Sequence, residues 1–131
     1  MPREMLLAAC RVAGVHVHIG MPDHVTALRA YNHVIEHCDE LCQLGDGSKG
    51  ERLRLYKQVA PNCWPQPYED WQDFYGYMVE QGLDQEPRGL WTLVRMSIHG
   101  TIEIRTFGTT DNPHKIIYWA DRCRKLCLQA M

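Results

Sequence analysis

The sequence lacks a long hydrophobic run, a secretory leader and an excess of basic charge. No apolar run reaches the length that spans a bilayer, and the first residues, Met1-Pro2-Arg3-Glu4, do not begin the apolar region of a signal peptide. The formal net charge of -2 argues against a nucleic-acid-binding surface. We therefore expect a soluble cytoplasmic protein with neither a membrane nor a nucleic acid as partner.

The chain also lacks internal repeats and any linker long enough to separate two domains. Its 131 residues, of which 45% are hydrophobic, are enough to bury one modest core. We expect a single domain over residues 1–131.

We also expect no disulfide bonds, although the number of cysteines is even. The pairs Cys38/Cys42 and Cys123/Cys127 are spaced like neighbours on successive helical turns. Together with the missing leader, this spacing favours reduced thiols that act as small core side chains. The cysteines are Cys10, Cys38, Cys42, Cys63, Cys123 and Cys127.

Hydrophobic periodicity predicts the order strand, helix, helix, strand, strand, helix. Strands are expected over 15–20, 90–98 and 101–107, and helices over 24–44, 68–81 and from 113 onward. Asp23 and Asn112 suit the caps of the first and last helices, and His99-Gly100 suits a hairpin turn. Residues 51–59 fit either a strand or a helical turn. Adjacent strands predict an α+β fold with a mostly antiparallel sheet and helices packed on one face.

Several groups of side chains have plain structural interpretations. Arg52, Arg54 and Lys57 fit a solvated basic face, and His33 and His37 fit a helix surface whose neighbouring cysteines are in the core. The expected core positions are Trp71, Phe74, Tyr75 and Tyr77 in the second helix, and Ile116, Ile117, Trp119, Ala120, Cys123, Leu126 and Cys127 in the last.

Two predicted strands have polar side chains on one face. Strand alternation places His16 with His18, and Glu103 with Arg105, opposite apolar neighbours. Two imidazoles and a carboxylate suit Mn²⁺, Zn²⁺ or Fe²⁺, and they suit Mg²⁺ when phosphates add oxygen ligands. A guanidinium beside them suits phosphate or carboxylate, and Arg95 is either a second anion contact or part of a hairpin ion pair. Ordinary surface histidines and an exposed ion pair are the alternative.

The ordered motifs resemble those of one enzyme family. Residues 14–23, GVHVHIGMPD, are similar to the G-x-H-V-H-[VI]-G-x-P-D segment of glutamate–cysteine ligases of the carboxylate–amine ligase type. Residues 70–75, 90–95 and 100–105 follow in that family's order. The last helix also resembles related amidoligases of the glutamine-synthetase-like superfamily, and the resemblance spans residues 12–120.

This resemblance implies a glutamine-synthetase-like half domain that uses ATP with Mg²⁺ or Mn²⁺. Such enzymes phosphorylate a carboxylate, which an amine then converts to an amide, and their small-molecule substrates are amino acids. By matching positions, His16 and Glu103 would bind the metal. His18 would contact nucleotide phosphates or the acyl phosphate, and Arg105 would hold phosphate or substrate carboxylate, so both would be catalytic. Arg95 would be a further phosphate or substrate contact.

The chain departs from the family in three ways. It resembles only the C-terminal half, without the E-x-E strand that supplies further metal ligands. Residues 42–50 replace the family's Ser-Asn-Pro-Phe stretch, and Leu93 stands where the family usually has Asp. The resemblance therefore implies one of four things: a homo-oligomer, an N-terminal-half partner chain that completes the site, a fragment of a longer enzyme, or an inactive relative.

Two other functions stay open. One is a non-catalytic relative that binds nucleotide or metal. The other is a small hydrolase that uses His16, His18 and Glu103 around a single metal ion with an open water position.

Overall fold

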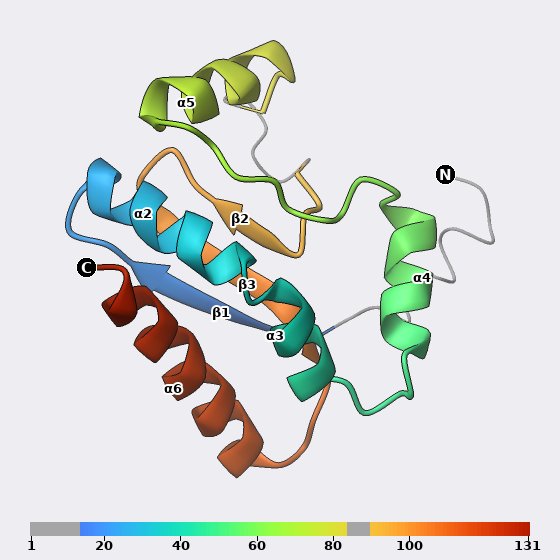
Figure 1. Ribbon diagram of the computed structural model, residues 1–131. Helices are drawn as coiled ribbons and strands as arrows, with labels where there is room; N and C mark the ends of the chain where they lie inside the picture. Colours follow the sequence, from blue (N-terminus) through green and yellow to red (C-terminus); the bar gives the residue numbers. More distant parts are fainter. Residues whose placement is uncertain (1–13, 84–89) are drawn as a thin grey trace.

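The structure is a computed structural model, and it describes residues 14–83 and 90–131 (Figure 1). Within these ranges it contains three strands and five helices. The strands are β1 (Gly14–Gly20), β2 (Val94–Met96) and β3 (Thr101–Gly108), and the helices are α2 (His24–Ile35), α3 (Cys38–Leu44), α4 (Glu51–Val59), α5 (Trp71–Glu80) and α6 (Pro113–Gln129). The prediction that Cys10 is reduced concerns a residue outside these ranges.

One antiparallel sheet of order β1-β3-β2 is at the centre of the fold. His18 of β1 and Arg95 of β2 both pair with Glu103 of β3. The predicted hairpin is present: Gly100 donates its N–H to the Ser97 carbonyl at 3.0 Å. Gly100 has φ 80°, a left-handed conformation that favours glycine. The predicted α+β class and antiparallel sheet are confirmed.

A β-bulge in β3 changes which of its side chains face the core. Between the pairs Val15–Phe107 and Val17–Ile104, one residue of β1 faces two residues of β3. The extra residue reverses the alternation of the strand. Phe107 is therefore fully buried in the core, although its odd number would otherwise place it on the face of Glu103.

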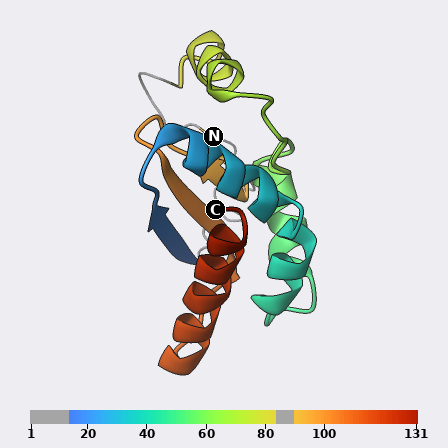
Figure 2. The ribbon, with the colours of Figure 1, turned by 60° about the vertical axis from the view of Figure 1, so that its left-hand side comes forward.

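Helices α2, α3 and α6 cover one face of the sheet (Figures 1 and 2). Their inner side chains and the apolar residues of the strands form the core. Trp119 of α6 stacks on Phe107 of β3, with ring centroids 4.9 Å apart and planes inclined by 6°. Helices α4 and α5 lie at the periphery (Figure 1).

The segment predicted as one helix over 24–44 is in fact two helices. As predicted, Asp23 caps the first, since its carboxylate accepts the Thr26 N–H at 2.7 Å. At the end of this helix the His37 N–H bonds to the Val34 carbonyl at 2.9 Å, which tightens the last turn. The second helix, α3, begins after this break and buries Cys38 against the core.

Residues 51–59, which fitted either a strand or a helical turn, form a helix, α4. Two other elements differ from their predicted extents. The strand predicted over 90–98 is reduced to Val94–Met96, because the Leu93 N–H bonds to the Cys63 carbonyl at 2.8 Å instead of extending the ladder. Helix α5 begins at Trp71 rather than near Tyr68, after its cap Asp70.

The predicted apolar faces of two helices are partly wrong. In α6, Trp119 is buried, but Ile116 and Ile117 are 37% and 66% exposed. In α5, Phe74 is buried, whereas Tyr75 and Tyr77 are exposed. The sequence pattern marks these helices as amphipathic, but their tertiary packing decides how wide the buried stripe is.

The five cysteines in the described part of the chain are free and buried, as predicted. Burial raises the pKa of Cys123 to about 12 and that of Cys127 to about 11, so these thiols stay protonated at neutral pH. Among the described helices, none is both long and apolar enough to cross a membrane.

Candidate functional site

Glu103 is the centre of a polar row that crosses the sheet. Its strand register places His18 on one side of it and Arg95 on the other. Alternation along β3 directs Glu103 away from the buried Ile102 and Ile104, which face the helices. The predicted neighbours therefore share the sheet face opposite α2, α3 and α6.

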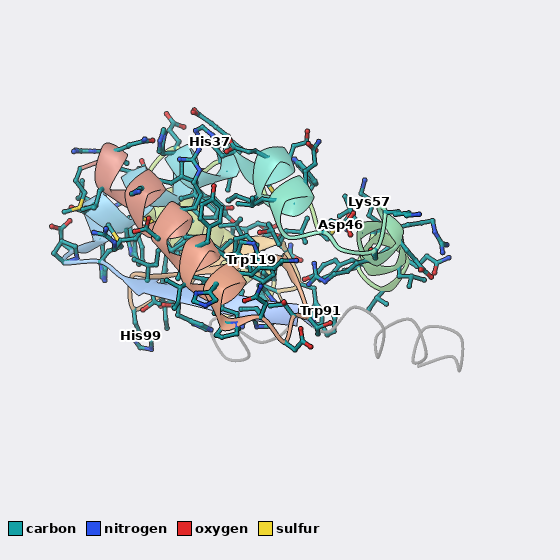
Figure 3. All side chains as sticks on the ribbon, turned by 90° about the horizontal axis from the view of Figure 1, so that it is seen from below. His37, Asp46, Lys57, Trp91, His99 and Trp119 are labelled. Atoms are coloured by element: carbon teal, nitrogen blue, oxygen red, sulfur yellow. The ribbon has the colours of Figure 1, made fainter. Side chains whose placement is uncertain are left out.

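Figure 3 shows the helices above β1, with Trp119 on their side of the strand and Trp91 lower down. Trp91 contacts the polar face, since its ring centroid is 5.4 Å from the Arg105 guanidinium carbon. His37 is at the upper margin of the same view, far from the sheet. The prediction that His33 and His37 lie on a helix surface agrees with this position.

Glu103 is 7% exposed, and its carboxylate contacts four side chains. His16 Nδ1 is 3.2 Å and His18 Nε2 3.8 Å from its Oε1 atom. Arg95 Nε donates a hydrogen bond to Oε2, and Arg105 Nε is 3.7 Å from Oε1. A buried carboxylate requires such partners, because leaving it unpaired costs several kcal/mol.

One ligand atom each from His16, His18 and Glu103 lies within 4.8 Å of the others. Two imidazole nitrogens and one carboxylate oxygen fit Mn²⁺, Zn²⁺ or Fe²⁺ better than Mg²⁺, which prefers oxygen ligands. Burial and the nearby Arg105 lower the pKa of His16 below its usual value. A lowered pKa keeps the imidazole neutral, which is the form that binds a metal.

Arg105 has hydrogen-bonding capacity that the protein does not use. Its Nε and Nη1 atoms are buried without a hydrogen-bond partner. Its guanidinium lies over the Trp91 ring, and its carbonyl accepts a hydrogen bond from Arg52 Nη2 at 3.1 Å. A guanidinium held in this way, with donors to spare, suits a phosphate or carboxylate.

Arg95 lies at the other end of the row, beside a cavity of about 210 Å³. Its Nη1 donates to the Leu90 carbonyl at 3.0 Å, which fixes the side chain along the sheet. His18, Glu103, Met78 and Met96 also line this cavity. The arrangement leaves room for a small group next to the proposed metal ligands.

The structure brings together all five predicted site residues: His16, His18, Arg95, Glu103 and Arg105. Their roles in metal, phosphate or substrate binding stay predictions. Sequence reasoning missed Arg52, which was assigned to a solvated face but is only 9% exposed. Its helical spacing with the buried Leu55 and Tyr56 was an available signal.

No protein-family model matches the chain. No solved structure matches it either. Among curated proteins, it is similar to several named glutamate–cysteine ligase.

The similarity extends over most of this chain but over a smaller part of the relatives. The Haloferax volcanii protein is 26% identical over an alignment of 130 positions, which covers 88% of this chain and 36% of the relative. The Natronomonas pharaonis protein is 27% identical over an alignment of 121 positions, which covers 81% of this chain and 33% of the relative. The Haloquadratum walsbyi protein is 29% identical over an alignment of 108 positions, which covers 72% of this chain and 30% of the relative. The chain is thus distantly similar to proteins named glutamate–cysteine ligase and spans about a third of their length.

Proposed function

We propose that the chain supplies part of the site of an ATP-dependent carboxylate–amine ligase of the glutamate–cysteine ligase type. In this reaction the γ-phosphoryl group of ATP passes to a substrate carboxylate, which leaves ADP and an acyl phosphate. An amine then displaces the phosphate, forms the amide bond and loses a proton. The proposal rests on one observation. The side chains of His16, His18 and Glu103 lie next to those of Arg95 and Arg105 on one face of the sheet.

The charges of this face favour a metal that arrives with a polyanion. The single carboxylate of Glu103 already faces two guanidiniums, those of Arg95 and Arg105. A divalent cation alone would make the face more positive still, whereas a metal–triphosphate complex would neutralise it. We therefore expect the chain to bind metal much more tightly in the presence of ATP.

Each residue has a defined task in the proposed site. His16 and Glu103 would hold the metal, and His18 would either join them or contact the phosphates. When bound, the metal supplies charge neutralisation to the phosphate oxygens. Arg105 donates its spare N–H groups to the transferred phosphoryl group or to the substrate carboxylate, and Arg95 orients Glu103.

We further propose that another chain, or a second copy of this one, supplies the remaining metal ligands. Three ligand atoms are too few for the metal ions that bridge and neutralise a transferred phosphoryl group. The substrates would then be amino acids, in keeping with the name of the relatives.

Calorimetry of the purified chain with MnCl₂, with ATP, and with both together tests this site. We expect Mn²⁺ and ATP together to bind at least about tenfold more tightly than either alone, which corresponds to about 1.4 kcal/mol. Glu103→Gln and His16→Ala should each reduce this binding by about tenfold or more, because a metal ligand is lost.

Glu40→Gln is the matched control, since Glu40 forms an exposed ion pair with Arg122 on the helical side of the molecule. It makes the same change in charge and should leave binding unchanged. Thermal unfolding of each variant shows whether the fold survives. Normal binding of Mn²⁺ and ATP by both site variants would overturn the proposed site.

The three-ligand cluster also supports a second function, a hydrolase with a single metal ion. Elemental analysis and activity assays separate the two. One tightly bound Zn²⁺ per chain, with ester or amide hydrolysis that does not depend on ATP, would favour the hydrolase. ADP formation that depends on Mn²⁺ and an amino-acid pair, after addition of a complementary chain, would favour the ligase.

A further inference from the structure

A second cavity, of about 200 Å³, lies between α3, α4 and strand β3. Six residues that matter to its chemistry line it: Asp39, Cys42, Gln43, Asp46, Arg52 and Thr106. None of them lines the cavity beside Glu103. The volume exceeds the roughly 30 Å³ share of one water molecule and is below the roughly 300 Å³ at which drug-sized pockets begin. It therefore suits a ligand of the size of one amino acid.

Arg52 is a buried cation that forms no close ion pair with a described residue, although the charge of Asp46, which also lines the cavity, acts on it. It is 9% exposed, and its Nη2 donates to the Arg105 carbonyl at 3.1 Å. Its Nε atom is buried with no hydrogen-bond partner. A buried guanidinium without a close ion pair is costly, so an anion bound next to it would stabilise it.

Thr106 adds a second unused polar group to the same cavity. The residue is 2% exposed, and its hydroxyl Oγ1 has no hydrogen-bond partner. It follows Arg105 at the bulge of β3. A hydroxyl and a guanidinium on one cavity wall can together donate to the two oxygens of a carboxylate.

The lining also carries negative charge. Asp46 accepts hydrogen bonds from the Ser48 N–H at 2.8 Å, the Ser48 hydroxyl at 2.6 Å and the Gly50 N–H at 2.6 Å. These bonds lower the pKa of Asp46, which is therefore ionised at neutral pH. Asp39 accepts from Gln43 Nε2 at 3.3 Å. The cavity thus presents charges of both signs to its contents.

We propose that this cavity, here called the α3–α4 cavity, binds a free α-amino acid. The ligand's carboxylate pairs with Arg52 and Thr106, and its ammonium group faces Asp39 and Asp46. A simple anion or a simple cation would find a partner of opposite charge for only one sign of the lining, whereas a zwitterion has a partner for each sign. Part of the lining comes from residues 42–50, the stretch that departs from the glutamate–cysteine ligase pattern, so the cavity belongs to this chain's own sequence.

This inference goes beyond the proposed ligase activity and does not require it. Calorimetry without metal or ATP, using L-glutamate, L-cysteine and L-alanine as probes and acetate and methylamine as singly charged analogues, tests it. We expect at least one amino acid to bind at least about tenfold more tightly than either analogue, because each charged hydrogen bond contributes that much. Failure of all three amino acids to bind, or equal binding of acetate, would overturn the proposal.

The variants Arg52→Gln and Arg54→Gln form a matched pair on one helix. Arg54 is exposed and pairs with Glu51 at 3.8 Å, so its loss should not change binding. Arg52→Gln should weaken amino-acid binding at least about tenfold. If circular dichroism shows that Arg52→Gln is unfolded, Thr106→Val and Asp39→Asn take its place, each with an expected loss of about fivefold or more. Unchanged binding in the folded variants would refute the assignment.

The thiol of Cys42 provides a readout at the cavity itself. Its contact with Cys38 and the nearby Arg52 lower the pKa of Cys42, whereas burial raises that of Cys127 on α6. Alkylation by iodoacetamide, followed by mass spectrometry, should therefore label Cys42 faster than Cys127. A saturating amino acid should slow labelling of Cys42 at least about threefold and leave Cys127 unaffected. An amino acid that binds without protecting Cys42 would show that it binds elsewhere.

Discussion

Glu103 shows that a buried carboxylate needs cationic or hydrogen-bonding side chains around it. With 7% exposure it would be costly to ionise alone, and the structure surrounds it with two imidazoles and two guanidiniums. These groups hold one another in place before any ligand arrives. The site face is thus preorganised by its own electrostatics.

Gly14, at the start of β1, is where a single methyl group would matter most. A Cβ atom there would lie 2.1 Å from the Phe107 carbonyl oxygen and 2.7 Å from Arg52 Nη2. Gly14→Ala must therefore push the strand or Arg52 away. We predict that it lowers the free energy of unfolding by about 1–3 kcal/mol, measured by urea denaturation.

Gly20→Ala, at the other end of the same strand, is the control for this prediction. A Cβ atom at Gly20 meets nothing within 4 Å, so the free energy of unfolding should change by less than about 0.5 kcal/mol. Equal losses in the two variants would mean that strand propensity, and not the close approach at Gly14, determines the effect.

At the scale of elements, the bulge in β3 and the packing of α6 depend on each other. The bulge directs Phe107 into the core, where its ring stacks on Trp119. The same bulge leaves Thr106 beside the α3–α4 cavity. One inserted residue therefore serves both the core and a candidate binding surface.

Helix α6 supplies a direct test of which face is buried. Trp119→Ala should lower the free energy of unfolding by about 3–5 kcal/mol, because a buried, stacked indole is lost. Ile117→Ala should change it by less than about 0.5 kcal/mol, because Ile117 is 66% exposed. Chemical denaturation of both variants measures these changes in the free energy of unfolding. A large loss at Ile117 would indicate that this side of α6 is covered by another chain.

At the scale of the whole molecule, the sheet ends at β1 on one side and at β2 on the other within the described part of the chain. An outer strand offers unpaired backbone groups to another strand. These outer strands favour association with another chain.

We predict that the native particle is larger than one 15.2 kDa chain. Light scattering after gel filtration, over a wide range of concentrations, measures its mass. A dimer or larger particle supports a site shared between copies. A particle of 15.2 kDa at every concentration would contradict self-association and would leave a separate partner chain as the source of the missing ligands.

Much of the local structure could be predicted because it depends on neighbours in the sequence. Asp23 and Asn112 cap their helices as expected, and Gly100 turns the hairpin. Alternation placed His16 with His18 and Glu103 with Arg105 on common faces. These features follow from periodicity and capping, which need no knowledge of distant contacts.

By itself, the sequence determined the α+β class, the antiparallel hairpin and the reduced state of the described cysteines. It also determined which residues form the polar face of the sheet. Only the tertiary structure decided that the helix over 24–44 breaks, that Ile117 is exposed and that Arg52 is buried. These outcomes depend on how elements far apart in the chain pack together. The angle of a helix on the sheet, and the one-residue shift at the bulge of β3, arise from contacts that no local pattern records.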